Sequence, residues 1–364
     1  MDHRVGAFDI DVVAPVRDLV VGWEAERWDR EGFPGERLDA LRATAAWTAF
    51  AEITPGRETQ ALLDVLRLIG RVDLSLGRLF EGHVNGLQLV ATYGTVDQRR
   101  MMMRAAGEGA LFGVWATEPT PGLTIVRTGD GAWRLDGRKS FATGAGHVDQ
   151  ALVTALREDG TKHLVNVALG ADKHRADIGG WRVRGMQGTI SGLFDFSGIV
   201  LDDASLIGEP DDYSTEPRFS AGAWRFTAVQ LGAIEGLARH LRDHLVATGK
   251  GADPIQRARF AACVSGARSA GEWVRRAAQL AEAQSDDAVA FVLMTRGVVE
   301  EAGLAMMEAA ARAVGTASFF TGNPIDRITR DLGLYLRQPV PDQARDRAAA
   351  AWLDHDCWGE DRWW

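Results

Sequence analysis

The spacing of apolar residues changes twice along this chain of 364 residues, and the change limits the folds that the chain can adopt. In residues 59–93, apolar side chains such as Leu63, Leu66 and Ile69 recur at intervals of three and four, the period of an α-helix. Residues 111–208 instead hold short apolar runs beside glycines, a pattern typical of strands and turns. From about Ser220 the helical period returns. The pattern predicts a β-region between two helical regions.

We therefore expect an α+β protein of three parts. Residues 1–107 are predicted to form an N-terminal helical domain, residues 108–212 a central β-barrel-like domain, and residues 213–364 a C-terminal helix bundle. The length and the 46% of apolar residues are sufficient for a large packed core.

Local signals predict several element boundaries. Residues 59–93 are expected as two helices that end at Gly94. Asp253 suits the N-cap of a later helix, and Pro254 suits its first position. A further helix is expected over residues 288–314, where glycine follows as a stop signal.

The middle region has one clear turn signal, Asp130-Gly131, which predicts a β-hairpin. The other expected strands are short apolar runs between turn residues. They are Leu111–Trp115, Trp133–Leu135, Ala151–Ala155, His163–Leu169, Trp181–Val183 and Leu193–Leu201.

Composition argues against several classes of protein. A net charge of −9 makes nucleic acid an unexpected partner. The two cysteines, Cys263 and Cys357, are too few for a disulfide framework and stand in no metal-ligand spacing. The sequence contains no run of 18 uncharged apolar residues, and residues 1–15 lack the pattern of a signal peptide. We expect a cytoplasmic protein without a membrane partner or a bound metal.

One long helix predicts self-association. Apolar residues from Phe260 to Ala281 form a continuous stripe. Together with the apolar helix at residues 288–314, this stripe offers more apolar surface than one bundle is expected to cover. We expect a homodimer or homotetramer assembled through the C-terminal helices.

Two segments of the middle region suit the wall of a pocket for a flat ring. Residues 115–119 and 135–144 each carry an aromatic side chain and a hydroxyl group. An aromatic side chain can pack on a ring face, and a hydroxyl can bond to ring heteroatoms. The alternative is two ordinary hairpins with buried aromatic side chains, and the residues by themselves leave both interpretations open.

The same segments resemble those of the acyl-CoA dehydrogenase superfamily. In that family a Thr-Glu-Pro strand and a Gly-x-Lys-x-aromatic-x-Thr strand hold the isoalloxazine ring of FAD. Thr117 and Thr143 match the two threonines, and Phe141 matches the aromatic residue on the flavin. Trp115 and Ala116 are expected beside them.

Further matches follow in the family's order. Residues 73–93 resemble a helix that ends in Tyr-Gly-Thr, residues 191–209 a strand after a Gly-x-x-x-Ser turn, and residues 323–331 a Pro-x-x-Arg-x-x-Arg-Asp element. The resemblance covers about residues 73–353, and it implies FAD, or alternatively FMN, and a small-molecule substrate such as an acyl-CoA. It also makes Arg225 a candidate for a substrate phosphate, with a surface salt bridge as the alternative.

Departures from the family concern the nucleotide end of the flavin. Residues 120–124 replace the family's Gly-Ala-Gly-Ser-Asp, and residues 245–251 lack its Arg-x-Gln-Phe-Gly, which reaches the FAD of a neighbouring subunit. Arg312 and Gly315 match the Gln-x-x-Gly-Gly element near the adenosine only in part. They are kept as cofactor-binding candidates.

The largest departure concerns the catalytic base. Most members carry a glutamate shortly after Arg-Asp, and that position is Pro339, which has no titratable group. Residues 223–227, where other members place the glutamate, contain no carboxylate. Glu235, further along the same helix, is a weak substitute whose alternative is a solvated helix face.

His83 stands where monooxygenase members of the superfamily carry a histidine that assists oxygen activation. The alternative for this residue is helix packing. Residues 141–145 also resemble those monooxygenases, which need no base of this kind.

The main expectation is an FAD-dependent oxidoreductase acting on an acyl thioester or a related substrate. The alternatives are a reduced-flavin monooxygenase of the same fold and a relative that has lost its chemistry.

Overall fold

The computed structural model describes residues 11–26 and 32–354. The chain first forms helices, and the two expected over residues 59–93 are confirmed, with Gly94 at the end of the second. The bounds are α1 Val13–Ala25, α2 Gly35–Arg42, α3 Ala46–Ala49, α4 Arg57–Val72, α5 Leu74–Tyr93 and α6 Val96–Gly107.

The middle of the chain forms two sheets that do not close into a barrel. The larger sheet has the order β10-β6-β5-β2-β3-β9, with β1 parallel to β5, and the smaller has the order β4-β8-β7. The bounds are β1 Phe112–Trp115, β2 Thr124–Arg127, β3 Trp133–Asp136, β4 Arg138–Ala142, β5 Gln150–Leu156, β6 Lys162–Ala168, β7 Ala176–Asp177, β8 Gly192–Asp195, β9 Val200–Leu201 and β10 Leu206–Ile207.

The hairpin at Asp130-Gly131 is confirmed, because β2 and β3 are antiparallel on either side of it. The strand expected over Trp181–Val183 is wrong, since these residues lie in a loop. The Trp181 indole nitrogen donates to the carbonyl oxygen of Met186 at 3.2 Å, and its ring meets the ring of Phe141 edge to face. The apolar run therefore packs a loop against its surroundings, and does not pair with another strand.

Helices return after the sheets. The predicted N-cap is confirmed, because the Asp253 side chain accepts a hydrogen bond from the backbone nitrogen of Ile255 at 2.8 Å. The bounds are α7 Arg218–Ala221, α8 Trp224–Ala247, α9 Pro254–Glu282, α10 Ala288–Val314, α11 Pro324–Tyr335 and α12 Pro341–Asp354. The fold class is therefore α+β, with strands between two sets of helices, while the exact domain boundaries stay a prediction.

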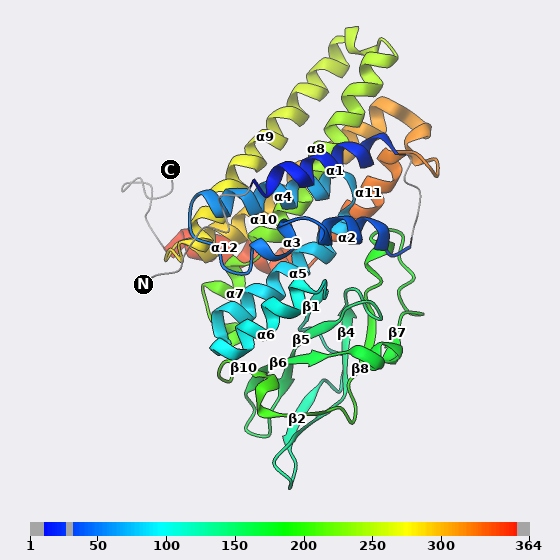
Figure 1. Ribbon diagram of the computed structural model, residues 1–364. Helices are drawn as coiled ribbons and strands as arrows, with labels where there is room; N and C mark the ends of the chain where they lie inside the picture. The colour runs from blue at the N-terminus through cyan, green and yellow to red at the C-terminus, as the bar shows by residue number, and fades with distance from the viewer. Residues whose placement is uncertain (1–10, 27–31, 355–364) are drawn as a thin grey trace.

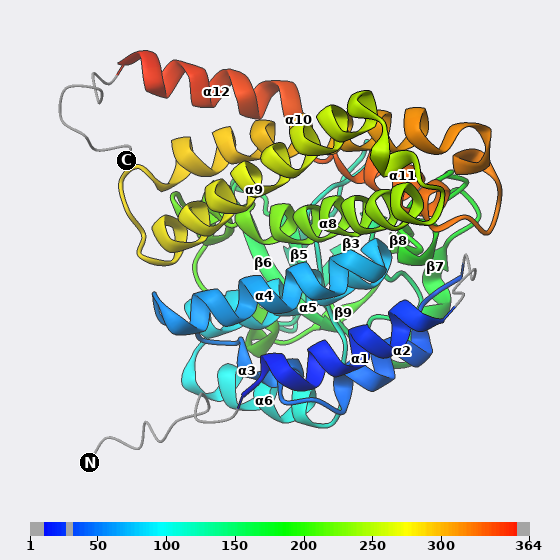
Figure 2. The same cartoon turned by 90° about the horizontal axis from the view of Figure 1, so that it is seen from above.

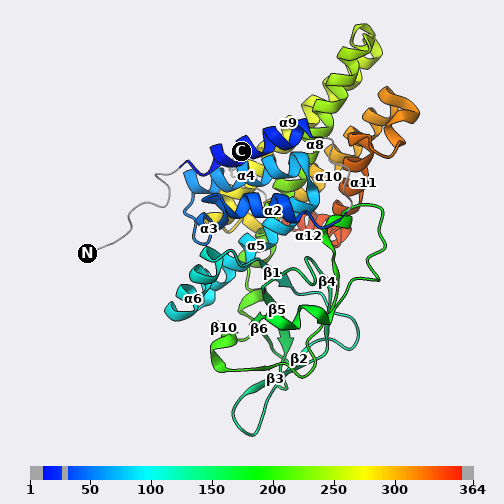
Figure 3. The ribbon, with the colours of Figure 1, turned by 45° about the vertical axis from the view of Figure 1, so that its right-hand side comes forward.

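The helices pack as one layered body on one side of the sheets (Figure 1). Helix α5 packs on β1, and α6 also lies beside the strands (Figure 3). Seen from above, α4, α8, α10 and α12 follow one another across the helical layer (Figure 2). The end of α8 and the start of α9 project beyond this layer.

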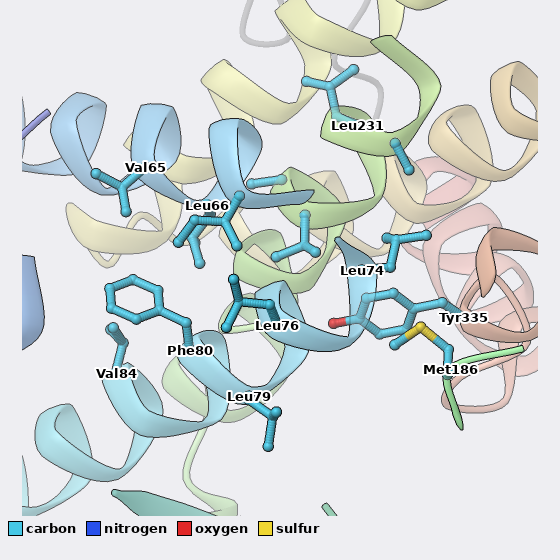
Figure 4. Packing of buried hydrophobic residues seen from close by; sticks show 14 of the residues in the cluster. Val65, Leu66, Leu74, Leu76, Leu79, Phe80, Val84, Met186, Leu231 and Tyr335 are labelled. Carbon is cyan, nitrogen blue, oxygen red and sulfur yellow. The ribbon is translucent and has the colours of Figure 1, made fainter. Parts of the chain in front are cut away.

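The core joins helices from both ends of the chain. Figure 4 shows residues of one buried cluster, which includes Leu66 of α4, Phe80 of α5, Leu231 of α8 and Tyr335 of α11. All four side chains are almost completely buried. Burial of large apolar side chains of this kind is the main source of stability in such a core.

Two glycines allow α4 and α8 to touch backbone to backbone. A Cβ atom on Gly70 would lie 2.1 Å from the carbonyl oxygen of Val229, and one on Gly232 would lie 2.1 Å from the carbonyl oxygen of Arg67. Any larger residue at either position would have to move backbone atoms in a densely packed core.

A buried ion pair fastens the end of β1 to β4. The Lys139 side chain is 0% exposed, and its ammonium donates to Glu118 at 2.7 Å, to the Thr154 hydroxyl at 3.1 Å and to the Ala116 carbonyl at 3.2 Å. Lys162 donates to the second oxygen of Glu118 at 2.7 Å. This cluster fixes the loop that carries Thr117 against the strand that carries Phe141.

The electrostatic balance of this cluster favours the charged carboxylate. Burial raises the pKa of Glu118, but the hydrogen bonds from Lys139 and Lys162 outweigh it, so the pKa lies below its ordinary value. Burial lowers the pKa of Lys139, and Glu118 offsets only part of this effect. A buried ammonium therefore depends on its carboxylate partner.

We predict that Gly70→Ala lowers the free energy of unfolding by about 3 kcal/mol or more, because the new methyl group collides with the backbone of α8. Chemical denaturation of both proteins measures the difference. Gly82→Ala is the matched control in α5: its Cβ would meet nothing within 4 Å. The control should leave stability unchanged or raise it by up to about 1 kcal/mol. Equal effects at the two positions would contradict the close approach of α4 and α8.

We predict that Glu118→Gln lowers the free energy of unfolding at pH 7 by about 3 kcal/mol, because it leaves a buried ammonium without its counter-ion. Adding Lys139→Met to this variant should restore most of the loss, since it removes the stranded charge. Urea unfolding of the four proteins of this cycle measures the coupling between the residues.

The pH dependence gives a second test of the same pair. The stability that Glu118 contributes is present above its unfolded pKa of about 4.3 and is lost as pH falls through its lower folded pKa. The wild-type protein should therefore lose this contribution only below about pH 4, and the Glu118→Gln variant should show no such loss. A wild-type profile that already declines between pH 7 and 5 because of Glu118 would contradict the prediction.

Candidate functional site

A cavity of about 980 Å³ lies where α5, the end of β1, β4 and the C-terminal helices meet. Its size is suited to a ligand with a ring system and a side chain. The described residues that line it include members of every predicted ring-binding segment. These are Trp115, Ala116, Thr117, Phe141 and Thr143.

Those residues are held together as one wall. The indole nitrogen of Trp115 donates to the carbonyl oxygen of Thr143 at 2.9 Å, which joins the two segments. The hydroxyl groups of Thr143 and Ser191 lie 3.1 Å apart, and Ser191 also lines the cavity. The structure thus brings the five predicted residues to one place, as the ring-pocket interpretation requires.

Phe141 is presented to the cavity by an irregularity in β4. The register with β8 shifts between Lys139 and Ala142, and Phe141 has a φ angle of 51°, an uncommon value for a residue that is not glycine. Its side chain is 60% exposed although it belongs to a strand, and Trp181 supports its ring edge to face with centroids 6.2 Å apart. An open aromatic face of this kind offers a stacking surface for a flat ring.

The opposite side of the cavity carries a chain of ion pairs and hydrogen bonds. Arg78 pairs with Glu81, and the amide of Asn85 donates to the same carboxylate. Arg225 donates to the Asn85 side-chain oxygen at 2.6 Å and to Glu282 at 2.9 Å. Both carboxylates are therefore bound by arginines, and neither is a free base.

The role of Arg225 in binding a substrate phosphate stays a prediction. Arg225 lines the cavity, and it is also ion-paired with Glu282. A substrate phosphate would have to compete with this carboxylate.

The residue at the position of the missing base is part of the cavity lining. Pro339 lines the cavity, and its carbonyl oxygen accepts a hydrogen bond from Arg296. A guanidinium therefore stands beside the position at which the superfamily's glutamate is expected.

The two weak catalytic candidates lie elsewhere. Glu235 is outside the set of described residues that line the cavity, and it pairs with Arg67 at 2.9 Å, where it ties α8 to α4. Its interpretation as a replacement base receives no support from this position.

His83 is a core residue. It is completely buried and stacks on Trp47, with ring centroids 3.8 Å apart. Its Nε2 donates to the Trp47 carbonyl oxygen at 2.8 Å, and its Nδ1 accepts from the Phe112 backbone nitrogen at 3.3 Å. Burial lowers the pKa of His83 to about 4, so the ring is neutral. Both ring nitrogens are engaged away from the cavity, which supports the helix-packing alternative.

Arg312 and Gly315, the candidates for the adenosine part, are also outside the set of described residues that line the cavity. Arg312 is mostly exposed near the end of α10 and pairs with Glu308 at 2.5 Å. Gly315 ends α10 with a φ angle of 76°. Their role in binding a nucleotide stays a prediction.

Sequence reasoning missed the polar residues of the cavity. Arg78, Glu81 and Asn85 are spaced by three and four within the largely apolar helix α5, so they share one helix face. Arg296 is the lone charge in the apolar run at residues 288–299. Polar residues that interrupt an apolar helix face were the signal that could have identified both groups.

Among the described residues, no helix combines the length and apolar character needed to cross a membrane. Within the same ranges, His, Cys, Asp and Glu side chains form no group of three or more placed to hold a metal ion.

No family model matches the chain. The chain is 26% identical over 228 residues to a probable FMNH2-dependent monooxygenase of Pseudomonas putida, covering 60% of this chain and 57% of that protein. It is 25% identical over 224 residues to a dibenzothiophene monooxygenase of Rhodococcus erythropolis, covering 57% and 54%. The match thus spans little more than half the length of these relatives. A cyclohex-1-ene-1-carbonyl-CoA dehydrogenase of Geobacter metallireducens is 24% identical over 292 residues, covering 74% of this chain and 76% of that protein.

Solved structures agree over almost the whole chain. The dibenzothiophene monooxygenase TdsC of Paenibacillus sp. A11-2, in a complex with FMN and indole, has a TM-score of 0.83 at 19% identity and covers 95% of this chain and 98% of its own. Butyryl-CoA dehydrogenase of Megasphaera elsdenii has a TM-score of 0.81 at 14% identity and covers 97% and 100%. Together with the sequence matches, these likenesses confirm the resemblance seen in the motifs: the chain has the fold of the acyl-CoA dehydrogenase superfamily, which includes flavin-dependent monooxygenases and acyl-CoA dehydrogenases.

Proposed function

We propose that the protein is a reduced-flavin-dependent monooxygenase that uses FMN and transfers an oxygen atom to a small organic substrate. The observation that carries this proposal is the composition of the cavity. The residues predicted to hold a flat ring line the cavity together, whereas the base position is Pro339, and Glu81 and Glu282 are bound by arginines. Oxygen transfer needs no carboxylate to remove a proton from the substrate carbon, whereas acyl-CoA dehydrogenation does.

The residues present fit a flavin ring. The exposed face of Phe141 offers a stacking surface, and the hydroxyl groups of Thr117, Thr143 and Ser191 lie along the same wall for the polar edge of the ring. Reduced flavin, when bound, supplies the electrons for oxygen activation. The chain's own part is to hold the ring, to orient the substrate beside it and to limit the access of water.

FMN is the better supported flavin. The ring wall is present in the cavity, whereas Arg312 and Gly315 stand outside it and the family's nucleotide motifs are altered. The relative from Pseudomonas putida is named as FMNH2-dependent, and TdsC was crystallised with FMN. FAD is the alternative that a direct binding comparison would distinguish.

The dehydrogenase interpretation is the weaker one. It would require a carboxylate that is both free and close to the substrate. Among the described cavity residues, Glu52 is exposed and has no ion pair, which makes it the one remaining carboxylate to test.

We also propose a homodimer or homotetramer. Ile255 and Val264 are exposed apolar residues of α9. A second copy of the chain would cover them.

We predict that Phe141→Ala weakens FMN binding by about tenfold, because it removes the stacking surface. Equilibrium dialysis or quenching of FMN fluorescence measures the affinity. Phe320→Ala is a matched control, since Phe320 is 61% exposed and lies outside the cavity. The assignment of the wall fails if the two variants bind FMN equally well.

We predict that the protein, with FMN, NADH and a separate flavin reductase, transfers one atom of ¹⁸O₂ into a substrate from the set indole, dibenzothiophene and methanesulfinate. These compounds are named for TdsC, for the Rhodococcus relative and for a methanesulfinate monooxygenase of Pseudomonas fluorescens with a similar fold. Mass spectrometry of the product detects the label. In the absence of oxygen, acyl-CoAs of several chain lengths should not bleach the protein-bound oxidised flavin. Rapid bleaching that Glu52→Gln or Glu235→Gln abolishes would instead identify a dehydrogenase with a replacement base.

A further inference from the structure

The cavity carries more positive than negative charge. Its described lining residues include arginines at positions 78, 218, 225, 296, 337 and 347, and glutamates at positions 52, 81 and 282. The excess of positive charge lies at one end of the cavity. At the other end, the ion pairs Arg78–Glu81 and Arg225–Glu282 neutralise the charge.

Two of the remaining arginines are paired with carboxylates outside the cavity lining. Arg337 pairs with Glu300 at 2.5 Å, and Arg347 pairs with Glu216 at 3.2 Å. Arg296 differs from both, because it has no carboxylate within 4 Å among the described residues.

Arg296 is placed to bind an anion in the cavity. Its guanidinium lies over the ring of Phe226, 5.3 Å from the centroid, and its Nη2 donates to the carbonyl oxygens of Gln338 and Pro339. These two bonds orient the planar group but do not neutralise its charge. In the part of the chain that the structure describes, its Nε and Nη1 have no hydrogen-bond partner, and neither atom is fully buried.

The surroundings of Arg296 disfavour an isolated cation. Burial lowers the pKa of Arg296 to about 10, Glu300 offsets part of this effect from a distance, and the nearby positive charge of Arg347 adds to it. An anion beside Arg296 would offset both effects, because it would supply the negative charge that this guanidinium lacks. Arginine is also the side chain best matched to a planar oxyanion, which can accept two parallel hydrogen bonds.

We propose that this end of the cavity binds an anionic oxo group of the substrate, a carboxylate or a sulfinate, with Arg296 as the main ligand and Arg347 as the second. The substrate is then a small organic acid, whose apolar part extends past Phe226 toward the flavin wall. This inference rests on the proposed function, because it assigns a substrate group to the same cavity. Because the inference concerns only the binding of an anion by arginines of this chain, binding measurements can test it without a catalytic reaction.

The superfamily's acyl-CoA substrates offer another source of negative charge, the phosphates of coenzyme A. A small acid is favoured here, because Arg296 lies beside Pro339 at the position of the missing base, where the reacting part of a substrate is expected. A phosphate-bearing tail would be expected at the mouth, near exposed Arg218.

The test is isothermal titration of the full chain, with and without FMN, against benzoate, its neutral counterpart benzamide, and coenzyme A. We expect benzoate to bind at least about tenfold more tightly than benzamide. Arg296→Gln should remove this preference, and Arg296→Lys should keep part of it. Arg268→Gln, which changes an exposed arginine of α9 outside the cavity, should leave it unchanged. Circular dichroism confirms that each variant is folded.

The outcomes separate the two proposals. Equal binding of benzoate and benzamide, or a preference that survives in Arg296→Gln, overturns the anion site even when FMN binds. Tight binding of coenzyme A that depends on Arg296 overturns the small-acid assignment. Failure to bind FMN, with an Arg296-dependent preference for benzoate still present, overturns the proposed function and retains the anion site.

Discussion

The candidate site depends on one buried ion pair. Lys139 is sealed in the protein and holds Glu118, and through it the loop that carries Thr117, against the strand that carries Phe141. A buried charge costs free energy unless it is paired, so the two segments cannot separate without leaving the Lys139 ammonium without its counter-ion. The Glu of Thr-Glu-Pro and the Lys of Gly-Arg-Lys therefore hold two parts of the cavity wall together.

The element at residues 323–331 likewise holds parts of the structure together. Asp331 accepts a hydrogen bond from the backbone nitrogen of Met186 at 2.5 Å, and Arg330 donates to the carbonyl oxygen of Arg184 at 2.7 Å. These contacts fix the loop behind Phe141 to α11. The chain resembles its superfamily in this framework and in Thr117, Phe141 and Thr143 of the cavity lining, whereas the position of the family's base is Pro339. A framework of this kind can remain while the chemistry at its centre changes, because the fastening residues do not touch the substrate.

Much of the fold was predictable from the sequence because local signals were strong. The apolar period at residues 59–93, the Asp253 cap and the glycine after residue 314 each specify their own backbone, and the structure follows them. The strand predicted over Trp181–Val183 is wrong because an apolar run can occur in a packed loop as readily as in a strand. Only the tertiary structure decides between the two. In the site, the ring wall was found because its residues lie in two short segments. Of the polar network only Arg225 was named, because its partners Asn85 and Glu282 are far from it in the chain and meet it only in the folded protein.

The close approach of α4 and α8 also affects the order in which the chain acquires its structure. The contact that Gly70 and Gly232 permit is reinforced by the pair Arg67–Glu235, whose partners are 168 residues apart. During synthesis, the face of α4 that meets α8 has no partner until the whole sheet region has left the ribosome. Contacts between such distant segments form slowly, since a long loop must close first. The nascent N-terminal helices therefore present an apolar surface to chaperones for as long as the sheet region is being made.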